Sequence, residues 1–451
     1  RPRYFQIRGI GERSHYFGEG APNFSVGFIL DDLDLSGLGM VGHLYDLQQI
    51  EVFKGPQSSV FGANAIAGFI SLRSVDPKSY NEQNHSISLG SDSHFQISSS
   101  FNYNINEELS FRLSGIHNYR DGFRNNIYKN IEDSNKREEM FYRIKLQYKP
   151  SSKINFLSTL IYADISNGYD VWSPDNNSNY QTFSDDDGED SQKTLGGSLR
   201  LNIPLTKTIK FTSITSSTKT DLVHAYDGDW ANDSYWLDQH GFDPLVEGWS
   251  YSFYDKNKKH RKNFTQEFRL SKNKLIFGIF YKDMEEQDHA SGYLFGGLAT
   301  NALSSYDFKI LSSYFQFDYD IIPSLRLSSN LRFEKNTIGY NGTSNGLDAY
   351  WESVELPRVN FKTDDFMIGY RSSLIFKRNS FTSFTSSLAR GYKSGGVNQQ
   401  PYLNDVSRSY GPEALIALEM GMKYQTSAIS SNITYFLGLR EDQQVSISSQ
   451  Q

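Results

Sequence analysis

The sequence of 451 residues contains no cysteine and no surplus of basic residues. It also has no uninterrupted run of about 18 apolar residues. The first absence excludes disulfide frameworks, thiolate metal sites and cysteine nucleophiles. The lack of a long apolar run excludes a transmembrane helix. The formal net charge is −7, and both signs are spread along the chain, which argues against a nucleic-acid partner.

Catalytic and metal-binding patterns are missing as well. The sequence has no G-x-S-x-G elbow, and its nine histidines include no H-E-x-x-H pair. The acidic run from Asp185 to Asp190 offers oxygen ligands for calcium, but it lacks the alternating spacing of an EF-hand loop. A solvated loop is the preferred interpretation of this run. We therefore expect a binding or transport protein that is not an enzyme and holds no cofactor or resident metal.

From residue 84 onward the sequence is rich in strict alternation of apolar and polar residues. The segments 140–149 (MFYRIKLQYK) and 325–334 (LRLSSNLRFE) show the pattern clearly. A period of two places apolar side chains on one face of a strand and polar side chains on the other. Strands of about ten residues with this pattern are typical of membrane β-barrels. We count about 15 such strands in the chain.

Short and long connections alternate between the predicted strands. Outer-membrane barrels sort their connections in this way, with short periplasmic turns and long extracellular loops. A soluble two-layer sheet protein does not, and open sheets rarely exceed about ten strands. The pattern therefore predicts an antiparallel all-β membrane barrel over residues 84–451. The expected short turns are 104–106, 150–152, 271–273, 323–324 and 378–379, and the expected long loops are 168–190, 227–259, 291–304, 340–357 and 394–410.

The first 78 residues differ from the rest, because they are glycine-rich and contain short apolar strands, predicted at Ile50–Phe53 and Phe69–Leu72. The stretch 49–72 (QIEVFKGPQSSVFGANAIAGFISL) resembles the plug signature of TonB-dependent outer-membrane receptors. QIRGIG at 6–11 and FILDDL at 28–33 resemble two upstream elements of that signature, in the same order. The residues that match the plug motif are Arg8, Gly9, Glu51, Lys54, Gly55, Pro56, Gly62, Asn64 and Gly68.

Two segments of the predicted barrel add to the resemblance. ARGYKSGG at 389–396 resembles a strand-to-loop phrase of the family, and ALEMGMKY at 417–424 resembles one of its strands, although Leu418 stands where tyrosine is usual. The resemblance implies a small α+β plug segment, residues 1–78, inside a barrel of about 22 strands. We expect this chain to be truncated at both ends, without the N-terminal half of the plug, its TonB-contacting segment and the final barrel strands.

The resemblance also implies that cations of the plug pair with glutamates of the barrel. The expected pairs join Arg8 and Lys54 to Glu419, with Glu267 as a second candidate carboxylate. A charge buried in this way needs a partner, because leaving it unpaired is costly. For Glu267 the alternative is a solvated charge on its strand.

Residues of the plug apex and of the long loops are the expected ligand contacts. Aromatic faces with cationic tips suit an oxygen-rich ferric chelate, although mutual packing of the loop aromatics is an equal alternative. The expected plug contacts are Arg13, His15, Tyr16 and Phe17, and the expected loop contacts are Tyr226, Trp230, Tyr235, Trp236 and His240.

The function implied by the resemblance is energy-coupled uptake of a scarce nutrient across the bacterial outer membrane. The implied partners are the lipid bilayer, the TonB complex of the inner membrane and a small-molecule cargo, with a ferric siderophore as the first expectation. Vitamin B12, haem and oligosaccharide remain open. The alternatives are a passive porin, which has no use for a plug motif, and a surface adhesin or phage-docking barrel.

Overall fold

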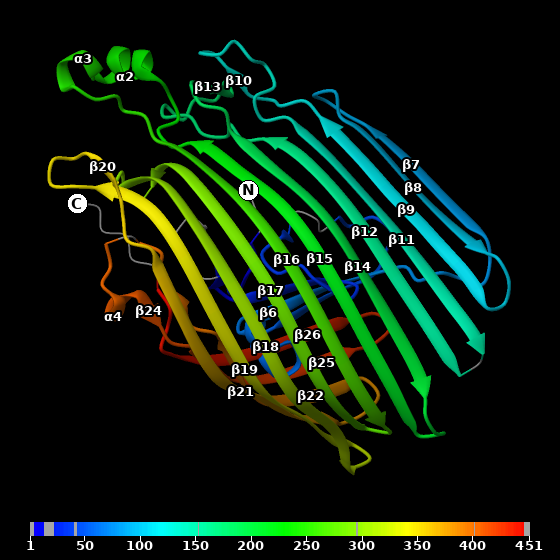
Figure 1. The fold of residues 1–451 in the computed structure, drawn as a ribbon. Coiled ribbons are helices and arrows are strands. Elements are labelled where there is room, and N and C mark those ends of the chain that lie inside the picture. Colours follow the sequence, from blue (N-terminus) through cyan, green and yellow to red (C-terminus); the bar gives the residue numbers. More distant parts are fainter. Residues whose placement is uncertain are drawn as a thin grey trace.

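The computed structural model describes residues 4–12, 22–39, 43–151, 153–294, 296–400 and 402–445. Its main element is a 16-stranded antiparallel sheet that forms a tall, curved wall (Figure 1). The wall strands follow one another in chain order from β7 at one edge to β26 at the other, and β20 pairs with β19 beside this path. The predicted all-β architecture and strand number are confirmed.

The wall strands are long, and most exceed ten residues. They are β7 Glu82–Leu89, β8 Phe95–Asn104, β9 Leu109–Arg120, β11 Arg137–Ser151, β12 Ile154–Gly168, β14 Glu189–Pro204, β15 Ile209–Asp227, β16 Tyr254–Lys272, β17 Leu275–Leu294, β18 Ala299–Ile322, β19 Leu325–Leu347, β21 Val359–Lys377, β22 Thr382–Lys393, β25 Glu413–Gln425 and β26 Ser430–Glu441. No helix in the described part of the chain is long and apolar enough to cross a membrane.

The two ends of the wall differ in their connections. At one end the turns are short, as between β16 and β17, which only residues 273–274 separate. At the other end the connections carry small accessory elements (Figure 1). These elements are β10 Asn125–Asn126, β13 Gln181–Thr182, α2 Asp233–His240, α3 Pro244–Glu247, β20 Ser353–Glu355, β23 Gly396–Val397, α4 Asp405–Arg408 and β24 Ser409–Tyr410.

Two of the expected long loops are wrong. Residues 291–304 and 340–357 contain the ends of strands: β17 continues to Leu294, β18 begins at Ala299, and β19 continues to Leu347. In the part of β17 that precedes the expected loop, both faces carry polar residues, as shown by the neighbours Gln287, exposed, and Asp288, buried. The alternation of apolar and polar residues therefore ends before the strands do, because main-chain pairing between neighbouring strands continues.

The wall buries polar residues and exposes apolar ones. On β17, Leu275, Phe277 and Ile279 are 43–45% exposed, whereas Lys282 and Glu286 on the inner face are buried. Such sorting suits a sheet whose outer face meets an apolar medium and whose inner face meets polar groups. Tyrosines mark the border of the outward apolar band: the hydroxyls of Tyr162 and Tyr281 each donate to the carboxylate two residues further on, at 3.1 Å.

The described residues between 4 and 78, which we call the plug segment, lie against the inner face of the wall (Figure 1). Their main element is a four-stranded mixed sheet in the order β4-β3-β6-β5, in which β3 and β6 are parallel and the other pairs are antiparallel. The strands predicted at Ile50–Phe53 and Phe69–Leu72 are confirmed within β5 and β6. The elements are β1 Gln6–Ile7, β2 Ile10–Gly11, β3 Val26–Leu30, β4 Leu33–Asp34, β5 Leu47–Lys54, α1 Ser58–Phe61, a 3-10 turn Ala63–Ala65 and β6 Gly68–Ser74.

An apolar cluster joins the plug segment to the wall. Leu30 and Leu33 of the plug segment are fully buried and belong to one cluster with Phe141, Ile161 and Ile165 of the wall. Burial of side chains of this size stabilises by about 1.5–3 kcal/mol each. The plug segment therefore docks on apolar contacts, and charged groups surround them.

Candidate functional site

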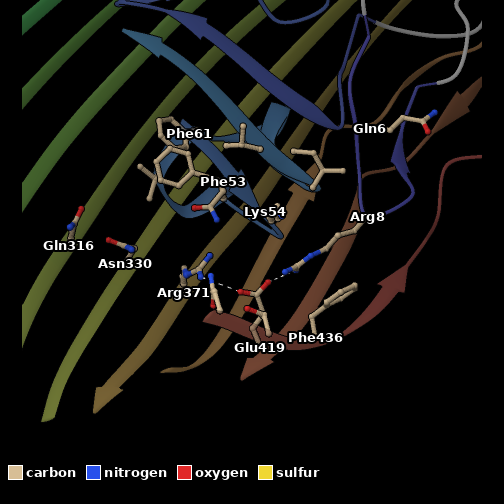
Figure 2. A pocket seen from close by; sticks show the side chains of 16 residues that line it. Gln6, Arg8, Phe53, Lys54, Phe61, Gln316, Asn330, Arg371, Glu419 and Phe436 are labelled. Atoms are coloured by element: carbon tan, nitrogen blue, oxygen red, sulfur yellow. Dashed lines mark hydrogen bonds and ion pairs between the residues drawn. The ribbon is translucent and has the colours of Figure 1, made fainter. Parts of the chain in front are cut away.

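Arg8 and Glu419, which lie 411 positions apart in the sequence, meet at the plug–wall boundary (Figure 2). Arg8 Nη1 donates to Glu419 Oε1, and the other carboxylate oxygen lies 3.4 Å from Arg371 Nη2. The Arg8 guanidinium also lies 3.9 Å from the centre of the Phe436 ring. Glu419 is therefore shared between a cation of the plug segment and a cation of the wall.

Lys54 lies in the same region but does not reach Glu419. It lines a cavity of about 1100 Å³ together with Arg8, Arg371 and Glu419 (Figure 2). Within the described ranges no carboxylate oxygen lies within 4.0 Å of its ammonium group, and Lys54 is exposed on β5. The structure thus places Lys54 near Glu419 without pairing the two.

Glu267 differs more strongly from the expectation. Its carboxylate accepts two hydrogen bonds from Arg269, at 2.8 and 2.7 Å, and a further one from the hydroxyl of Tyr314. Arg269 lies two residues away on the same face of β16, so it reaches Glu267 without any contribution from the plug segment. Among the described residues, no cation of the plug segment pairs with Glu267.

Two motif glycines explain how the plug backbone approaches the wall. Gly55 has φ +77° and Gly62 has φ +83°, which favours glycine at both positions. A Cβ atom at Gly55 would lie 2.6 Å from a carboxylate oxygen of Glu419, and one at Gly62 would lie 2.7 Å from a carboxylate oxygen of Glu334. The two glycines therefore leave space for glutamates of the wall.

The remaining motif residues have local roles. Gly9 has φ +77° in the β1–β2 turn, and Glu51 is exposed on β5. Pro56 packs against Gly391, where an added Cβ would lie 2.8 Å from it. The side-chain oxygen of Asn64 accepts a hydrogen bond from the backbone of Phe24 at 3.3 Å, and Gly68 begins β6.

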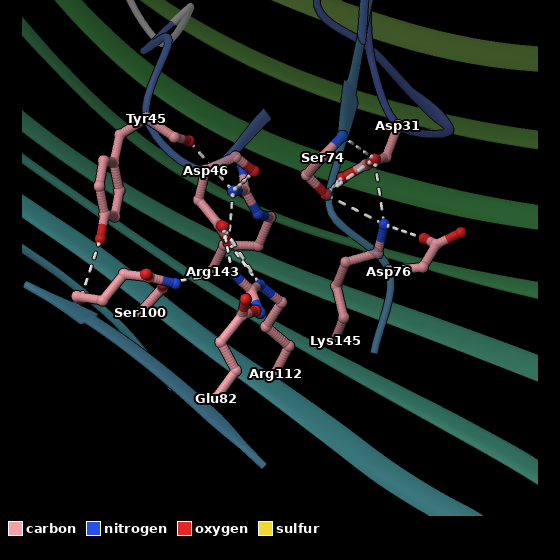
Figure 3. Close-up of polar contacts among 11 residues, drawn as sticks. Asp31, Tyr45, Asp46, Ser74, Asp76, Glu82, Ser100, Arg112, Arg143 and Lys145 are labelled. Atoms are coloured by element: carbon pink, nitrogen blue, oxygen red, sulfur yellow. Dashed lines mark hydrogen bonds and ion pairs between the residues drawn. The ribbon is translucent and has the colours of Figure 1, made fainter. Parts of the chain in front are cut away.

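The largest set of plug–wall ion pairs has the opposite polarity from the one expected. Lys145 of β11, only 2% exposed, places its ammonium 2.6 Å from Asp76 and 3.3 Å from Asp31 (Figure 3). It also donates to the hydroxyl of Ser74 at 3.0 Å. Here the plug segment supplies the carboxylates and the wall supplies the cation.

The same polarity recurs along the wall. Arg112 binds Asp46 through two nitrogens, and Arg143 lies 3.5 Å from the same carboxylate (Figure 3). Lys282 lies 2.7 Å from Asp34. Arg200 pairs with Asp32, and Lys393 lies 3.1 Å from Glu12. A signal was present in the sequence, because the cations occupy the polar phase of alternating strands and FILDDLDL concentrates three aspartates.

The predicted loop aromatics gather at the long-loop end of the wall. Trp230 stacks on Trp172 with ring centres 5.7 Å apart, and Tyr235 packs on Phe183 at 4.7 Å. We call residues 169–190 and 228–253 the rim lobe, because these contacts and a hydrogen bond from Asn232 to the Phe183 carbonyl join the two segments.

The other members of the predicted set also contact neighbours within or beside the rim lobe. Trp236 packs on His240 at 5.1 Å, and the Tyr226 hydroxyl donates to Asp255 at 2.9 Å. Mutual packing therefore accounts for much of this cluster. Arg13, His15, Tyr16 and Phe17 lie outside the described residues.

Solved structures share this arrangement, whereas no protein-family model matches the chain. The chain is similar to the ferric yersiniabactin uptake receptor FyuA from Yersinia pestis, with 15% identity and a TM-score of 0.78 over 94% of this chain and 64% of that one. The siderophore receptor PiuA from Acinetobacter baumannii matches with 14% identity and a TM-score of 0.68, covering 91% and 64%. The chain has the fold of TonB-dependent outer-membrane receptors. It spans 64% of the length of each of these two receptors.

In this receptor fold the connection between β22 and β25, residues 394–412, turns inward. The side-chain amide of Asn23 donates to the carbonyls of Ser394 and Gly395, at 3.2 and 2.8 Å. Further along, the Tyr306 hydroxyl of β18 donates to the carbonyl of the fully buried Val397 at 3.1 Å. This connection therefore touches both the plug segment and the wall.

The acidic run at 185–190 belongs to the rim lobe, and two of its carboxyl groups have raised pKa values. Burial raises the pKa of Asp185, and the negative charges of Asp186 and Asp229 raise it further. Burial likewise raises the pKa of Asp186, against the opposing charge of Lys129. Among the residues with a described placement, no group of three or more His, Asp or Glu side chains is arranged to hold a metal ion.

Proposed function

We propose that this chain is part of an energy-coupled receptor of the bacterial outer membrane that imports a scarce nutrient, with a ferric siderophore as the first candidate. Residues 1–78 act as the plug and residues 84–451 as part of the barrel. The observation that carries the proposal is the small mixed sheet held across the inner face of a membrane-type wall by buried ion pairs. A passive porin needs no sheet across its pore, and an enzyme needs catalytic groups rather than a movable plug.

The proposal requires that the plug segment move relative to the wall during transport. The absence of cysteine allows a direct test, because Ser58→Cys and Gly391→Cys introduce the chain's only thiols. A Cβ at Gly391 would lie 3.2 Å from the Ser58 hydroxyl, which is close enough for a disulfide. In the full-length receptor, the oxidised double variant should bind cargo and fail to import it. Reduction should restore import to the level of the single variants.

Energy coupling needs a second measurement. Cells that express the intact gene should accumulate a radiolabelled ferric chelate only when TonB is functional. Import that persists without TonB, or through the cross-linked plug, would show a passive pore and refute the proposal.

A further inference from the structure

The long-loop end of the wall is strongly acidic. Residues 169–190 contain seven carboxylates, residues 228–253 contain five and residues 348–357 contain three, while the three segments together contain no lysine and no arginine. The chain as a whole has 45 basic residues against 52 acidic ones. The imbalance is therefore a property of these loops and not of the composition.

Cations from neighbouring strands and loops compensate only part of this charge. Lys129 lies 2.7 Å from Asp187, Lys256 lies 3.5 Å from Glu189, and His224 lies 2.6 Å from Asp190. Three other carboxylates of the rim lobe, those of Asp186, Asp238 and Glu247, have no cation within 4.0 Å in the described ranges, and the last two are exposed. The rim lobe thus keeps a negative field at its surface.

Aromatic faces lie beside these carboxylates. Trp172 and Trp230 are stacked and are 50% and 38% exposed, and Trp249 is 50% exposed. In the described part of the chain, no lysine or arginine lies over a tryptophan ring. Tryptophan is the ring that attracts a cation most strongly, within about 6 Å of its centre. The rim lobe therefore offers half-exposed tryptophan rings that carry no lysine or arginine of the described chain.

We propose that the rim lobe selects cargo of net positive charge, namely a metal chelate that carries a free ammonium or guanidinium group. The inference rests on the proposed uptake function and names its substrate class. A surface of one sign raises the local concentration and association rate of oppositely charged ligands, and it repels an anionic chelate. The exposed tryptophans then hold the cationic group by their ring faces.

Two chelates with the same iron-binding core but opposite charge test this preference. One is a linear ferric trihydroxamate with a terminal ammonium, of charge +1, and the other is its succinylated form, of charge −1. Binding to the purified full-length receptor in detergent is measured by quenching of tryptophan fluorescence at low and at high salt. The cationic chelate should bind at least about tenfold more tightly at low salt, and salt should shrink the difference.

Two variants test whether the rim lobe causes the preference for the cationic chelate. The triple variant Asp186→Asn/Asp238→Asn/Glu247→Gln should remove most of the preference. Trp172→Leu should weaken the cationic chelate alone, by about two- to fivefold. The control, Glu107→Gln/Glu108→Gln, removes exposed carboxylates in the short turn between β8 and β9, at the opposite end of the wall, and should leave the preference unchanged.

Several outcomes would overturn the inference. These are equal binding of the two chelates, tighter binding of the anionic one, or a preference that survives in the triple variant. Capture of a lysine-rich peptide with no binding of either chelate would also overturn it, by assigning the surface to a polypeptide. TonB-dependent import is measured separately, so import of an anionic chelate would refute this inference and leave the proposed function standing.

Discussion

The plug sheet and the wall sheet use similar residues and sort them in opposite ways. β3, with the sequence VGFIL, is buried along nearly its whole length, and Leu30 is fully buried. β17 exposes Leu275 and Phe277 and buries Glu286. Strand β3 of the plug sheet packs its apolar residues inward as a soluble domain does, whereas the wall turns them toward an apolar surrounding. The exception within the plug sheet is β5, on which Ile50 and Val52 are 50% and 52% exposed. The comparison shows that hydrophobicity alone does not locate the interior of this molecule.

Ion pairs surround the apolar contacts at the boundary between the two sheets. Asp31, Asp46 and Asp76 of the plug segment meet Arg112 and Lys145 of the wall. A buried ion pair is not in itself a strong stabiliser, because desolvation offsets much of the attraction. Removing one partner of such a pair is costly, however. Because the carboxylates belong to the plug segment and the cations to the wall, the pairs also fix the position of the plug segment.

The largest expected effect lies at this boundary. Lys145→Met leaves Asp31 without its cation and Asp76 with Arg73 alone, so plug docking should weaken by about 3–5 kcal/mol. Protease sensitivity of residues 1–78 in increasing urea measures the loss. The triple variant with Asp31→Asn and Asp76→Asn should recover much of it, and a loss below about 1 kcal/mol for Lys145→Met would contradict the assigned role of the pairs.

The opposite sorting of the two sheets predicts unequal costs for the same substitution. Leu33→Ala, at a fully buried position of β4, should cost about 2–5 kcal/mol. Leu199→Ala, at an outward position of β14 that is 45% exposed, should cost far less, since lipid fills the space of the lost side chain. Urea unfolding in liposomes compares the two, and equal costs would refute the opposite sorting.

Two adjacent residues of β19 can test which face of the wall meets the apolar surrounding. Leu327 lies between Tyr319 and Leu374 on the outward face, and Ser328 points to the inner face beside Asp318. Arginine at position 327 should cost about 2–4 kcal/mol within a bilayer, whereas arginine at 328 should be tolerated. Unfolding free energies in liposomes give the comparison, and similar values would show that the strand register is wrong.

The smallest effect is expected at the long-loop end, where an ion pair is exposed. Lys129→Gln breaks the pair with Asp187, a residue whose side chain is 91% exposed, and should cost less than about 1 kcal/mol. Thermal unfolding measures it against Lys145→Gln as the buried counterpart. If Lys129→Gln cost as much stability as Lys145→Gln, the prediction that the exposed ion pair contributes less than the buried one would be wrong.

Much of the fold could be predicted from the sequence, because a period of two is a local signal. Segments such as 140–149 and 325–334 show this period directly, and the short turns mark the ends of the strands. The prediction was wrong at 291–304, where Gly292, Gly296 and Gly297 suggest a loop in the sequence, but main-chain pairing between β17 and β18 extends both strands into this segment.

The site could be predicted less well, because its contacts join segments far apart in the chain. Lys145 is visible in the sequence as a polar residue of an alternating strand, but nothing local identifies Asp31 and Asp76 as its partners. Arg8 and Glu419 were expected to meet only because of the family resemblance. Glu267 was expected to reach the plug segment and instead pairs with Arg269, its neighbour on β16.

The hydrogen bonds from Asn23 to the β22–β25 connection have a mechanical consequence. Asn23 belongs to the plug segment, and it is attached to the carbonyls of Ser394 and Gly395. A load that draws the plug segment toward the short-turn end must either rupture this attachment or drag the connection inward with it. Under such a load the β22–β25 connection at the long-loop end would share the tension with the plug segment, and the order in which these bonds break would set when the connection begins to move.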